Sequence, residues 1–444
     1  MAQSRHVVAI PFPGRGHINP MMVLSRQLIA SGIHITFVVT EEWLGLINSA
    51  HPPPPPELNF MMIPNCIPSE HGRGKDHKGF VKAVFTKMTE PVEKLLDRLE
   101  PVPQAIIADT ALHWAVEVGN RRGIPVCSLF TMSAAFFSVR LNLEKLPPLE
   151  NPHSPVREKD ELVEKYIPGI RLIKLSDVDD VYVASSELAL QTISTARKAQ
   201  CMLFTSFYEL ESCVIDSLRE DLNYPVYTIG PSVPHMLPLK AESNDHITWL
   251  DSQPKDSVLY ISLGSFLSVS QSQFEEIVMG IFVSKVKFFF WVARENFSLV
   301  REYCGDNGLV VPWCDQLNVL RHPSVGCFLT HCGFNSTLET LFAGVPVLAL
   351  PILWDQKSNG RLLADEWNTG FNLRDIRGKD GILSREEIKL AVMKLMDLEE
   401  NEAKEIRKRA LDWSRTSKIA VKEGGSSFVS LKKFISDVID RVEC

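Results

Sequence analysis

Short apolar runs of strand length alternate with amphipathic helical segments along most of this 444-residue chain. At its start, the apolar run 6–11 leads into a tight glycine turn at 13–16, and apolar residues then recur at helical spacing from 17 to 31. A β-branched run follows at 33–40. A strand, a glycine turn, a helix and a second strand form a βαβ unit, which builds a parallel sheet through a right-handed crossover. The chain is therefore expected to be α/β.

The alternation recurs in both halves of the chain, and its length suits two domains of about 200 residues each. Further strands are predicted at 105–109, 126–131, 201–205, 226–229, 258–263, 288–292, 326–330 and 345–350. The stretch 231–245 contains three prolines and little periodicity. We therefore predict an N-terminal domain at 1–230, a linker at 231–246, a C-terminal domain at 247–427 and a terminal helix at 428–444. Parallel sheets of this kind place ligands at the carboxyl ends of their strands, here in the cleft between the halves.

Charge and cysteine content narrow the expected partners and compartment. The formal net charge is −7 and the basic residues are scattered, so neither a nucleic acid nor an anionic membrane surface is expected. The nine cysteines are odd in number and contain no Cys-x-x-Cys pair, which favours reduced thiols in a cytoplasmic protein. No run reaches the roughly 18 apolar residues of a membrane span, and no signal-peptide pattern precedes the first strand.

The stretch from Trp313 to Gln356 concentrates polar side chains at the junction of a strand, a turn and a helix. The apolar strand 326–330 is followed by Gly333 and by a helix that we expect to begin near Asn335. Free N–H groups and the positive end of a helix dipole at such a junction bind phosphate. The side chains that could donate to a diphosphate there are His331, Asn335 and Ser336, and Glu339 could accept from sugar hydroxyls. The alternative is that Ser336 and Glu339 form only a capping box.

The whole block resembles the C-terminal signature of the plant family of UDP-sugar-dependent glycosyltransferases. It matches at both ends, in the centre His-Cys-Gly-x-Asn-Ser-Thr-Leu-Glu and in the closing Asp-Gln, and the resemblance extends to 13–20, Asp109 and Thr131. It implies the GT-B fold, in which two Rossmann-like domains turn parallel sheets toward a central cleft and the terminal helix crosses back to the first domain. Two positions depart from the family pattern: Phe334 replaces the usual Trp, and Asp315 stands where Pro is common.

His17 and Asp109 are the candidate catalytic pair. His17 follows a glycine turn at a helix start, and Asp109 ends a neighbouring strand. Imidazole can act as a base near neutral pH, and a carboxylate on its other ring nitrogen would fix the tautomer. The structural alternatives are a solvated histidine at a helix start and an aspartate that caps the helix at Ala111. The family resemblance implies that a glycine-flanked His and a strand-end Asp form a catalytic dyad, and it favours the functional interpretation.

Two other functions remain open from the residues alone. Gly14-x-Gly16, with Glu41 after the second strand, weakly resembles a dinucleotide-binding fingerprint, although Asn19 replaces its third glycine. This pattern would suit an NAD(P)-dependent oxidoreductase. A UDP-sugar-binding protein without catalysis is the second alternative, and the presence of both His17 and Asp109 argues against it.

The resemblance implies how the donor would bind. Trp313 would stack on uracil beside the backbone of Cys314 and the side chain of Gln316, although Trp313 could also be an ordinary core residue. The diphosphate site would comprise Ser265, His331, Gly333, Phe334, Asn335 and Ser336. Ribose hydroxyls would bind Glu339, and hydroxyls of the transferred sugar would bind Asp355, Gln356 and Thr131. Gln356 is typical of glucose users in the family, whereas Asp355 and Gln356 could also simply start a helix.

We expect a hexosyltransferase of the EC 2.4.1 type that acts in plant secondary metabolism. It would transfer glucose from UDP-glucose, with inversion, to a hydroxyl of a small lipophilic metabolite, and it would act as a cytoplasmic monomer. No cofactor or metal is expected. Asp177-Val-Asp179 has the Asp-x-Asp spacing with which another glycosyltransferase fold holds a divalent ion, but it lies in a charged stretch that we interpret as a solvated loop.

Acceptor contacts are predicted from three places: the loop 65–79, the helix after Thr131, and the segment 147–169, which we expect to be exposed. The apolar residues that favour a lipophilic acceptor there are Phe80, Phe136, Phe137, Leu141, Leu143 and Leu146.

Overall fold

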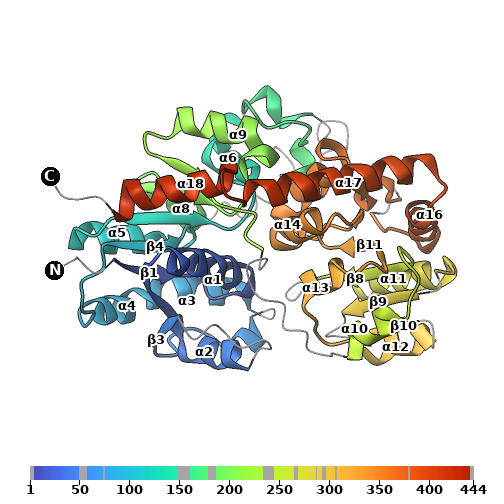
Figure 1. Cartoon of the computed structure of the whole chain (residues 1–444), viewed down its shortest axis with the longest axis horizontal. Helices are drawn as coiled ribbons and strands as arrows, with labels where there is room; N and C mark the ends of the chain where they lie inside the picture. Colours follow the sequence, from blue (N-terminus) through green and yellow to red (C-terminus); the bar gives the residue numbers. More distant parts are fainter. Residues whose placement is uncertain are drawn as a thin grey trace.

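Two parallel β-sheets form the frame of the molecule (Figure 1). The computed structural model describes residues 5–49, 58–73, 76–147, 161–178, 187–233, 245–264, 269–286, 288–292, 297–305, 308–378 and 381–440. The first sheet has the strand order β3-β2-β1-β4-β5-β6-β7, and the second has the order β10-β9-β8-β11-β12-β13. Non-consecutive neighbours in each sheet require crossover connections, as βαβ units do. The predicted α/β class is confirmed.

The strands of the first sheet are β1 His6–Ile10, β2 His34–Thr40, β3 Asn59–Ile63, β4 Ala105–Asp109, β5 Val126–Phe130, β6 Cys201–Phe204 and β7 Val226–Thr228. Those of the second are β8 Val258–Ser262, β9 Phe288–Val292, β10 Gly308–Val311, β11 Val325–Thr330, β12 Val347–Ala349 and β13 Gly370–Asn372. The central strands β1, β4, β5, β8 and β11 are buried along their whole length, because helices cover both faces of a parallel sheet. The sequence analysis did not predict β3, β10 and β13, and all three lie at sheet edges.

Helices connect and cover the strands. Those of the first half are α1 Arg15–Ala30, α2 Glu41–Asn48, α3 His77–Lys87, α4 Thr89–Leu96, α5 His113–Arg122, α6 Ala134–Leu141, α8 Glu187–Ala196 and α9 Tyr208–Asp221. Those that follow are α10 Asp245–Asp251, α11 Gln271–Val283, α12 Phe297–Cys304, α13 Gln316–Leu320, α14 Phe334–Ala343, α15 Asp355–Arg361, α16 Arg385–Met396, α17 Asn401–Ala420 and α18 Ser426–Phe434. None of the helices in the described ranges combines the length and the apolar character needed to cross a lipid bilayer.

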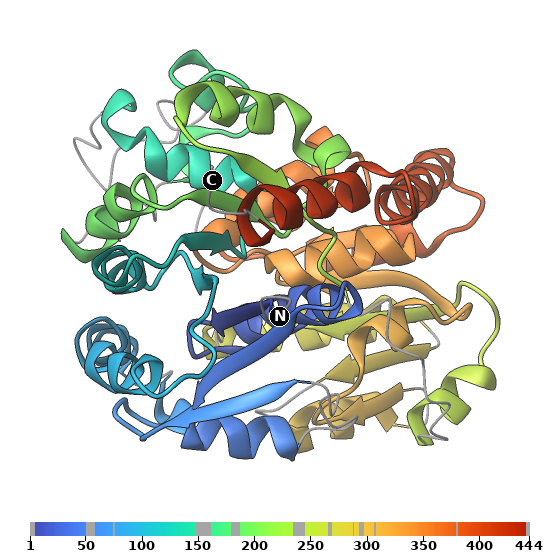
Figure 2. The same ribbon diagram turned by 60° about the vertical axis from the view of Figure 1, so that its left-hand side comes forward.

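The last two long helices connect the halves. α17 packs against α14 and touches α9, whereas α18 packs against β7 of the first sheet. In Figures 1 and 2 these two helices, drawn in red, follow one another on one side of the molecule. The ring of Phe434 is fully buried against Tyr227 at 5.7 Å, and the Tyr227 hydroxyl donates to Asp437 Oδ2 at 2.7 Å. The end of the chain therefore completes the core of the first half.

Two of the predicted connecting segments lie partly outside the described residues. Most of the predicted linker, residues 234–244, lies outside the described residues. The segment 147–169 was expected to be exposed, and its part at 148–160 also lies outside them. In the described part of this segment, Val163 and Ile167 are buried in the core. The expectation is wrong there, because apolar residues at irregular spacing still pack when a loop folds back onto a domain.

Replacing Phe434 by Ala should destabilise the protein by about 3 to 5 kcal/mol, since it leaves a cavity between α18 and the first sheet. Urea unfolding followed by tryptophan fluorescence measures this change. Val429→Ala is the matched control, because Val429 lies on the same helix and is 54% exposed. It should change stability by less than about 0.5 kcal/mol. Equal effects of the two substitutions would show that α18 is not part of the core.

Candidate active site

His17, Asp109 and Thr131 meet at the carboxyl edge of the first sheet. His17 lies in the first turn of α1, directly after β1, while Asp109 ends β4 and Thr131 follows β5. β1, β4 and β5 are neighbours in the sheet, so their carboxyl ends lie side by side. His17 Nδ1 is 2.7 Å from Asp109 Oδ2 and 2.9 Å from Thr131 Oγ1. Thr131, predicted to reach the sugar, thus contacts the imidazole in this structure.

The carboxylate of Asp109 has two partners. Its Oδ1 accepts from the backbone N–H of Ala111 at 2.9 Å, while Oδ2 faces His17. The capping alternative and the pairing with His17 are therefore both realised, one on each oxygen. A proton on His17 Nδ1 can donate to Asp109, and this arrangement leaves Nε2 as the basic nitrogen.

A turn with several polar side chains joins β11 to α14 in the second half. The N-cap of α14 is Gly333, and no side chain caps the helix. Its first N–H groups therefore remain available to an anion. The ring of His331 fits between two glycines, because a Cβ at Gly264 or Gly333 would lie 2.9 or 2.5 Å from its Nε2. Burial lowers the pKa of His331 to about 4, so the imidazole is neutral at pH 7 and can donate a hydrogen bond.

The capping-box interpretation of Ser336 and Glu339 is wrong. α14 starts at Phe334, so Ser336 lies inside its first turn rather than at the cap. Both side chains instead accept from Gln316 Nε2, at 2.9 and 2.7 Å. Gln316 in turn accepts from the Tyr260 hydroxyl at 3.2 Å. A network of polar side chains thus connects strand β8, helix α13 and helix α14.

Two buried carboxylates of the second half have raised pKa values. Burial raises the pKa of Glu339 to about 7, against a partial opposing effect of its hydrogen bond from Gln316. Burial also raises the pKa of Asp355 to about 6, opposed by the hydrogen bond from Asn359 and by the charge of His17. Perturbed acids in a cleft are typical of functional sites.

The two halves touch at this point. Asn335 Nδ2, at the start of α14, donates to the backbone oxygen of Gly16 at 3.0 Å. The turn that carries His17 is therefore in direct contact with the amino end of α14. A ligand with its diphosphate at α14 would have its sugar next to His17.

The remaining predicted site residues have varied environments. The Trp313 side chain is 43% exposed, so it is not a core residue, whereas Cys314 and Phe334 are buried. Asp355 and Gln356 do start helix α15, and Gln356 Oε1 accepts from the backbone N–H groups of Ile352 and Leu353. Ser265 lies outside the described residues.

Comparison with known proteins shows the family to which the chain belongs. A model of the family described as UDP-glucoronosyl and UDP-glucosyl transferase matches residues 174–403, and a glycosyltransferase N-terminal domain model matches residues 3–45. UDP-glycosyltransferase 87A2 of Arabidopsis thaliana is 46% identical over 98% of this chain and 97% of its own length. The chain belongs to the plant UDP-glycosyltransferase family. It is a transferase, and the oxidoreductase alternative is wrong.

Solved structures of two plant UDP-glycosyltransferases share the fold. Os79 of O. sativa, in complex with U2F and trichothecene, aligns with a TM-score of 0.83 at 26% identity and covers 97% of this chain and 100% of its own. UGT71G1 of Medicago truncatula, complexed with UDP-glucose, aligns with a TM-score of 0.82 at 25% identity and covers 98% of both chains. The GT-B fold that the resemblance implied is confirmed.

Sequence reasoning missed two residues that orient this UDP-glycosyltransferase's site. Tyr260 is fully buried, and its hydroxyl reaches both Gln316 and Cys314 Sγ. Asn359 donates to Asp355 Oδ2 at 2.9 Å and to the backbone oxygen of Cys332 at 3.0 Å. The i,i+4 spacing of Asp355 and Asn359 on one helix could have revealed the second pair. The role of Tyr260 depends on strand pairing and leaves no local pattern.

Two interpretations of side chains are overturned. Asp177 does not lie in a solvated loop: it is fully buried, and its carboxylate pairs with Arg361 and Arg374. Asp179 lies outside the described residues. Most of the apolar side chains assigned to the acceptor belong to the core instead, because they are buried: Phe80, Phe136, Phe137, Leu141 and Leu146. Leu143 is partly buried against the same core.

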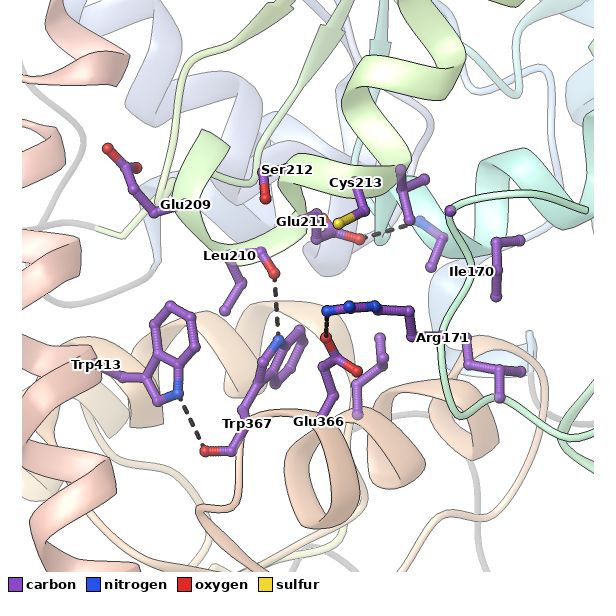
Figure 3. Close-up of a pocket in the computed structure, with 15 residues that line it drawn as sticks. Ile170, Arg171, Glu209, Leu210, Glu211, Ser212, Cys213, Glu366, Trp367 and Trp413 are labelled. Atoms are coloured by element: carbon purple, nitrogen blue, oxygen red, sulfur yellow. Dashed lines mark hydrogen bonds and ion pairs between the residues drawn. The ribbon is translucent and has the colours of Figure 1, made fainter. Parts of the chain in front are cut away.

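A separate pocket of about 200 Å³ lies between the halves (Figure 3). It is lined by parts of α6, α9 and α17 and by the turn η7, Leu362–Glu366, that continues α15. Trp367 Nε1 donates across the boundary to the backbone oxygen of Leu210 at 3.3 Å. None of the predicted site residues lines this pocket.

Glu339→Gln should change the pH dependence of stability in the ligand-free enzyme. The ordinary pKa of a glutamate is near 4.5, and that of Glu339 is about 7 in the folded protein. The stability that the Glu339 carboxyl group contributes is therefore fully present below pH 4.5 and is lost as the pH rises through 7. A Gln side chain is neutral at every pH and does not show this loss. The free energy of unfolding of the variant, relative to wild type, should therefore rise by on the order of 2 kcal/mol from pH 5 to pH 8. Urea unfolding at both pH values checks this, and an equal effect at both would contradict it.

Proposed function

We propose that this enzyme transfers glucose from UDP-glucose to a hydroxyl of a small lipophilic plant metabolite, with inversion at the anomeric carbon. The observation that carries the proposal is the contact of Asn335 with Gly16. It joins the turn of the candidate base to the helix end of the candidate diphosphate site. UGT71G1, which shares the fold, was solved with UDP-glucose, and this supports glucose as the sugar.

His17 is the proposed general base and Asp109 its partner. With the Nδ1 proton donated to Asp109, Nε2 accepts the proton of the acceptor hydroxyl as the oxygen attacks the anomeric carbon. Asp109 stabilises the imidazolium that forms. Thr131 Oγ1, at 2.9 Å from Nδ1, helps to hold the ring in this orientation.

The second half would hold the donor. Trp313 is proposed to stack on uracil, with Gln316 beside it, and Glu339 to accept from the ribose hydroxyls. Its raised pKa would fall on binding, because hydroxyl donors favour the charged carboxylate. Asp355 and Gln356 are proposed to bind the hydroxyls of glucose. Both lie at the start of α15.

The leaving diphosphate would be stabilised by the amino end of α14. Its uncapped N–H groups and the side chains of the neutral His331, Asn335 and Ser336 are proposed to face the charge that develops as the bond to the sugar breaks. Ser265, which lies outside the described residues, is proposed to join them. We propose that this replaces a metal ion. Asp177, half of the suggested metal motif, already pairs with two arginines. Attack from the side opposite UDP inverts the α-linked donor to a β-glucoside.

The acceptor is proposed to lie between His17 and the aromatic pair formed by His77 and Trp354. The ring of Phe12 is 5.0 Å from that of His17. His77, at the start of α3, lies 5.0 Å from Trp354, which directly precedes Asp355. Aromatic surfaces of this kind favour a lipophilic acceptor, and Os79 was solved with a trichothecene. We place the reaction in the cytosol, where reduced cysteines persist. The seven cysteines whose side chains the structure describes are free.

Replacing His17 by Ala should lower turnover by about 10² to 10⁴-fold, because it removes the general base. UDP affinity should be unchanged, since the donor site belongs to the other half. UDP release assays and calorimetric titration with UDP measure the two quantities. His34→Ala, an exposed histidine at the opposite end of a neighbouring strand, is the control and should retain full turnover. A His17→Ala enzyme with normal turnover would refute the assignment.

Trp313→Ala should raise the dissociation constant of UDP by roughly tenfold or more, because stacking of an aromatic ring on a base contributes about 1 to 3 kcal/mol. The melting temperature should stay the same, since the indole is largely exposed. Tyr303→Ala removes another exposed aromatic ring, 40% exposed on α12, and should leave UDP binding intact. Calorimetry decides the matter: equal affinities in the two variants would exclude Trp313 from the uracil site.

A further inference from the structure

Asp177 is a buried carboxylate of the first half whose main partners belong to the second half. It ends the short helical turn η5, Leu175–Asp177, and is fully buried. Arg361 Nε donates to its Oδ2 at 3.0 Å, and Arg374 Nη1 donates to its Oδ1 at 2.9 Å. The backbone N–H of Lys174 also donates to Oδ2, at 3.0 Å. Hydrogen bonds thus satisfy both carboxylate oxygens, as a buried charge requires.

These contacts hold the helix that carries the candidate sugar site. Arg361 is the last residue of α15, and Asp355 is the first. In the middle of this helix, the Ser358 hydroxyl donates to the backbone oxygen of Asp177 at 3.3 Å. With only seven residues, α15 is about 10 Å long. A shift at its carboxyl end therefore moves Asp355 and Gln356 at its amino end.

Acids of the second half hold the other side of Arg361. Asp365 Oδ2 accepts from its Nη1 at 2.9 Å, and Asp375 accepts from Nη1 and Nη2 at 2.7 Å each. These two acids lie on the same side of the domain boundary as α15. Their side chains are partly exposed, whereas that of Asp177 is buried. Of the acids that pair with Arg361 here, Asp177 is thus the one that belongs to the other half of the molecule.

The chain beyond Arg361 continues the same interface. In Figure 3, Trp367 reaches Leu210, and Arg171 approaches Glu366 with 3.8 Å between their charged groups. The segment 358–367 therefore contacts the first half at several points, from Ser358 to Trp367. The candidate sugar contacts lie shortly before this segment, at the start of α15. The candidate uracil and ribose contacts, Trp313 and Glu339, lie outside this segment.

We propose that Asp177 is a positioning residue for the donor sugar: through Arg361 and Ser358 it fixes α15 against the acceptor domain, so that Asp355 and Gln356 hold the transferred hexose beside His17. This inference rests on the proposed function. It predicts that the glucose part of the donor, but not its UDP part, is sensitive to the identity of residue 177.

The test is Asp177→Asn, which keeps the size of the side chain and removes its charge. The Michaelis constant for UDP-glucose should rise by about tenfold or more, with a lower turnover, because a small displacement of positioning groups has a large effect on rate. The dissociation constant of UDP should change less than about twofold. Arg374→Lys, which keeps the charge but loses the two-pronged contact with Asp177 and Ser176, should show the same selective change to a smaller degree.

Asp365→Asn is the matched control. It also removes an acid from Arg361, but one from its own half, and it should leave both constants near wild type. Unchanged UDP-glucose kinetics in Asp177→Asn and Arg374→Lys, or parallel losses of UDP and UDP-glucose affinity, would overturn the positioning role. Asp355→Asn separates this outcome from a failure of the proposed function. If it leaves the Michaelis constant for UDP-glucose unchanged, the sugar assignment itself is wrong.

Discussion

The contact between the glycine turn after β1 and the amino end of α14 is the constraint on which the rest of this enzyme depends. Each parallel sheet brings the polar ends of its strands to one edge, and neither edge alone holds both a candidate base and a candidate diphosphate site. The hydrogen bond from Asn335 to Gly16 joins them. The arrangement of the helices around the two sheets, and the return of α18 to the first half, serve to keep these edges together.

Burial shifts pKa values in the second half in two directions. It makes His331 a neutral hydrogen-bond donor and raises the pKa values of Glu339 and Asp355. Burial of the two carboxylates is costly although each accepts a hydrogen bond from a side-chain amide, and a sugar nucleotide would add hydroxyl partners to them. The Gln316 network, fixed by Tyr260, holds the ribose end in position before the donor arrives.

The boundary between the two halves is polar at the contacts that position helix α15. Apolar contacts such as that of Phe207 with Trp413 bury surface at this boundary, but they are not directional. The buried ion cluster around Asp177 is directional, because a carboxylate displaced from its arginines is left charged in a medium of low polarity. Buried ion pairs of this kind contribute little net stability. In the proposed arrangement they fix the orientation of helix α15 between the two halves.

The sequence by itself determined the α/β class, the central strands and the strand-turn-helix junction before α14, because each depends on local periodicity or on a short motif. The resemblance to the family singled out the pair His17 and Asp109. The edge strands β3, β10 and β13 escaped the sequence analysis, since they are short and the pairing that defines them as strands is a tertiary feature. Tertiary structure alone decided that Gln316 joins Ser336 to Glu339, that Phe80 and Phe137 serve the core, and that Asp177 is a buried partner of two arginines rather than a solvated acid. The physical reason is that burial, and with it the state of a charge, is set by segments far away in the chain, which no local pattern records.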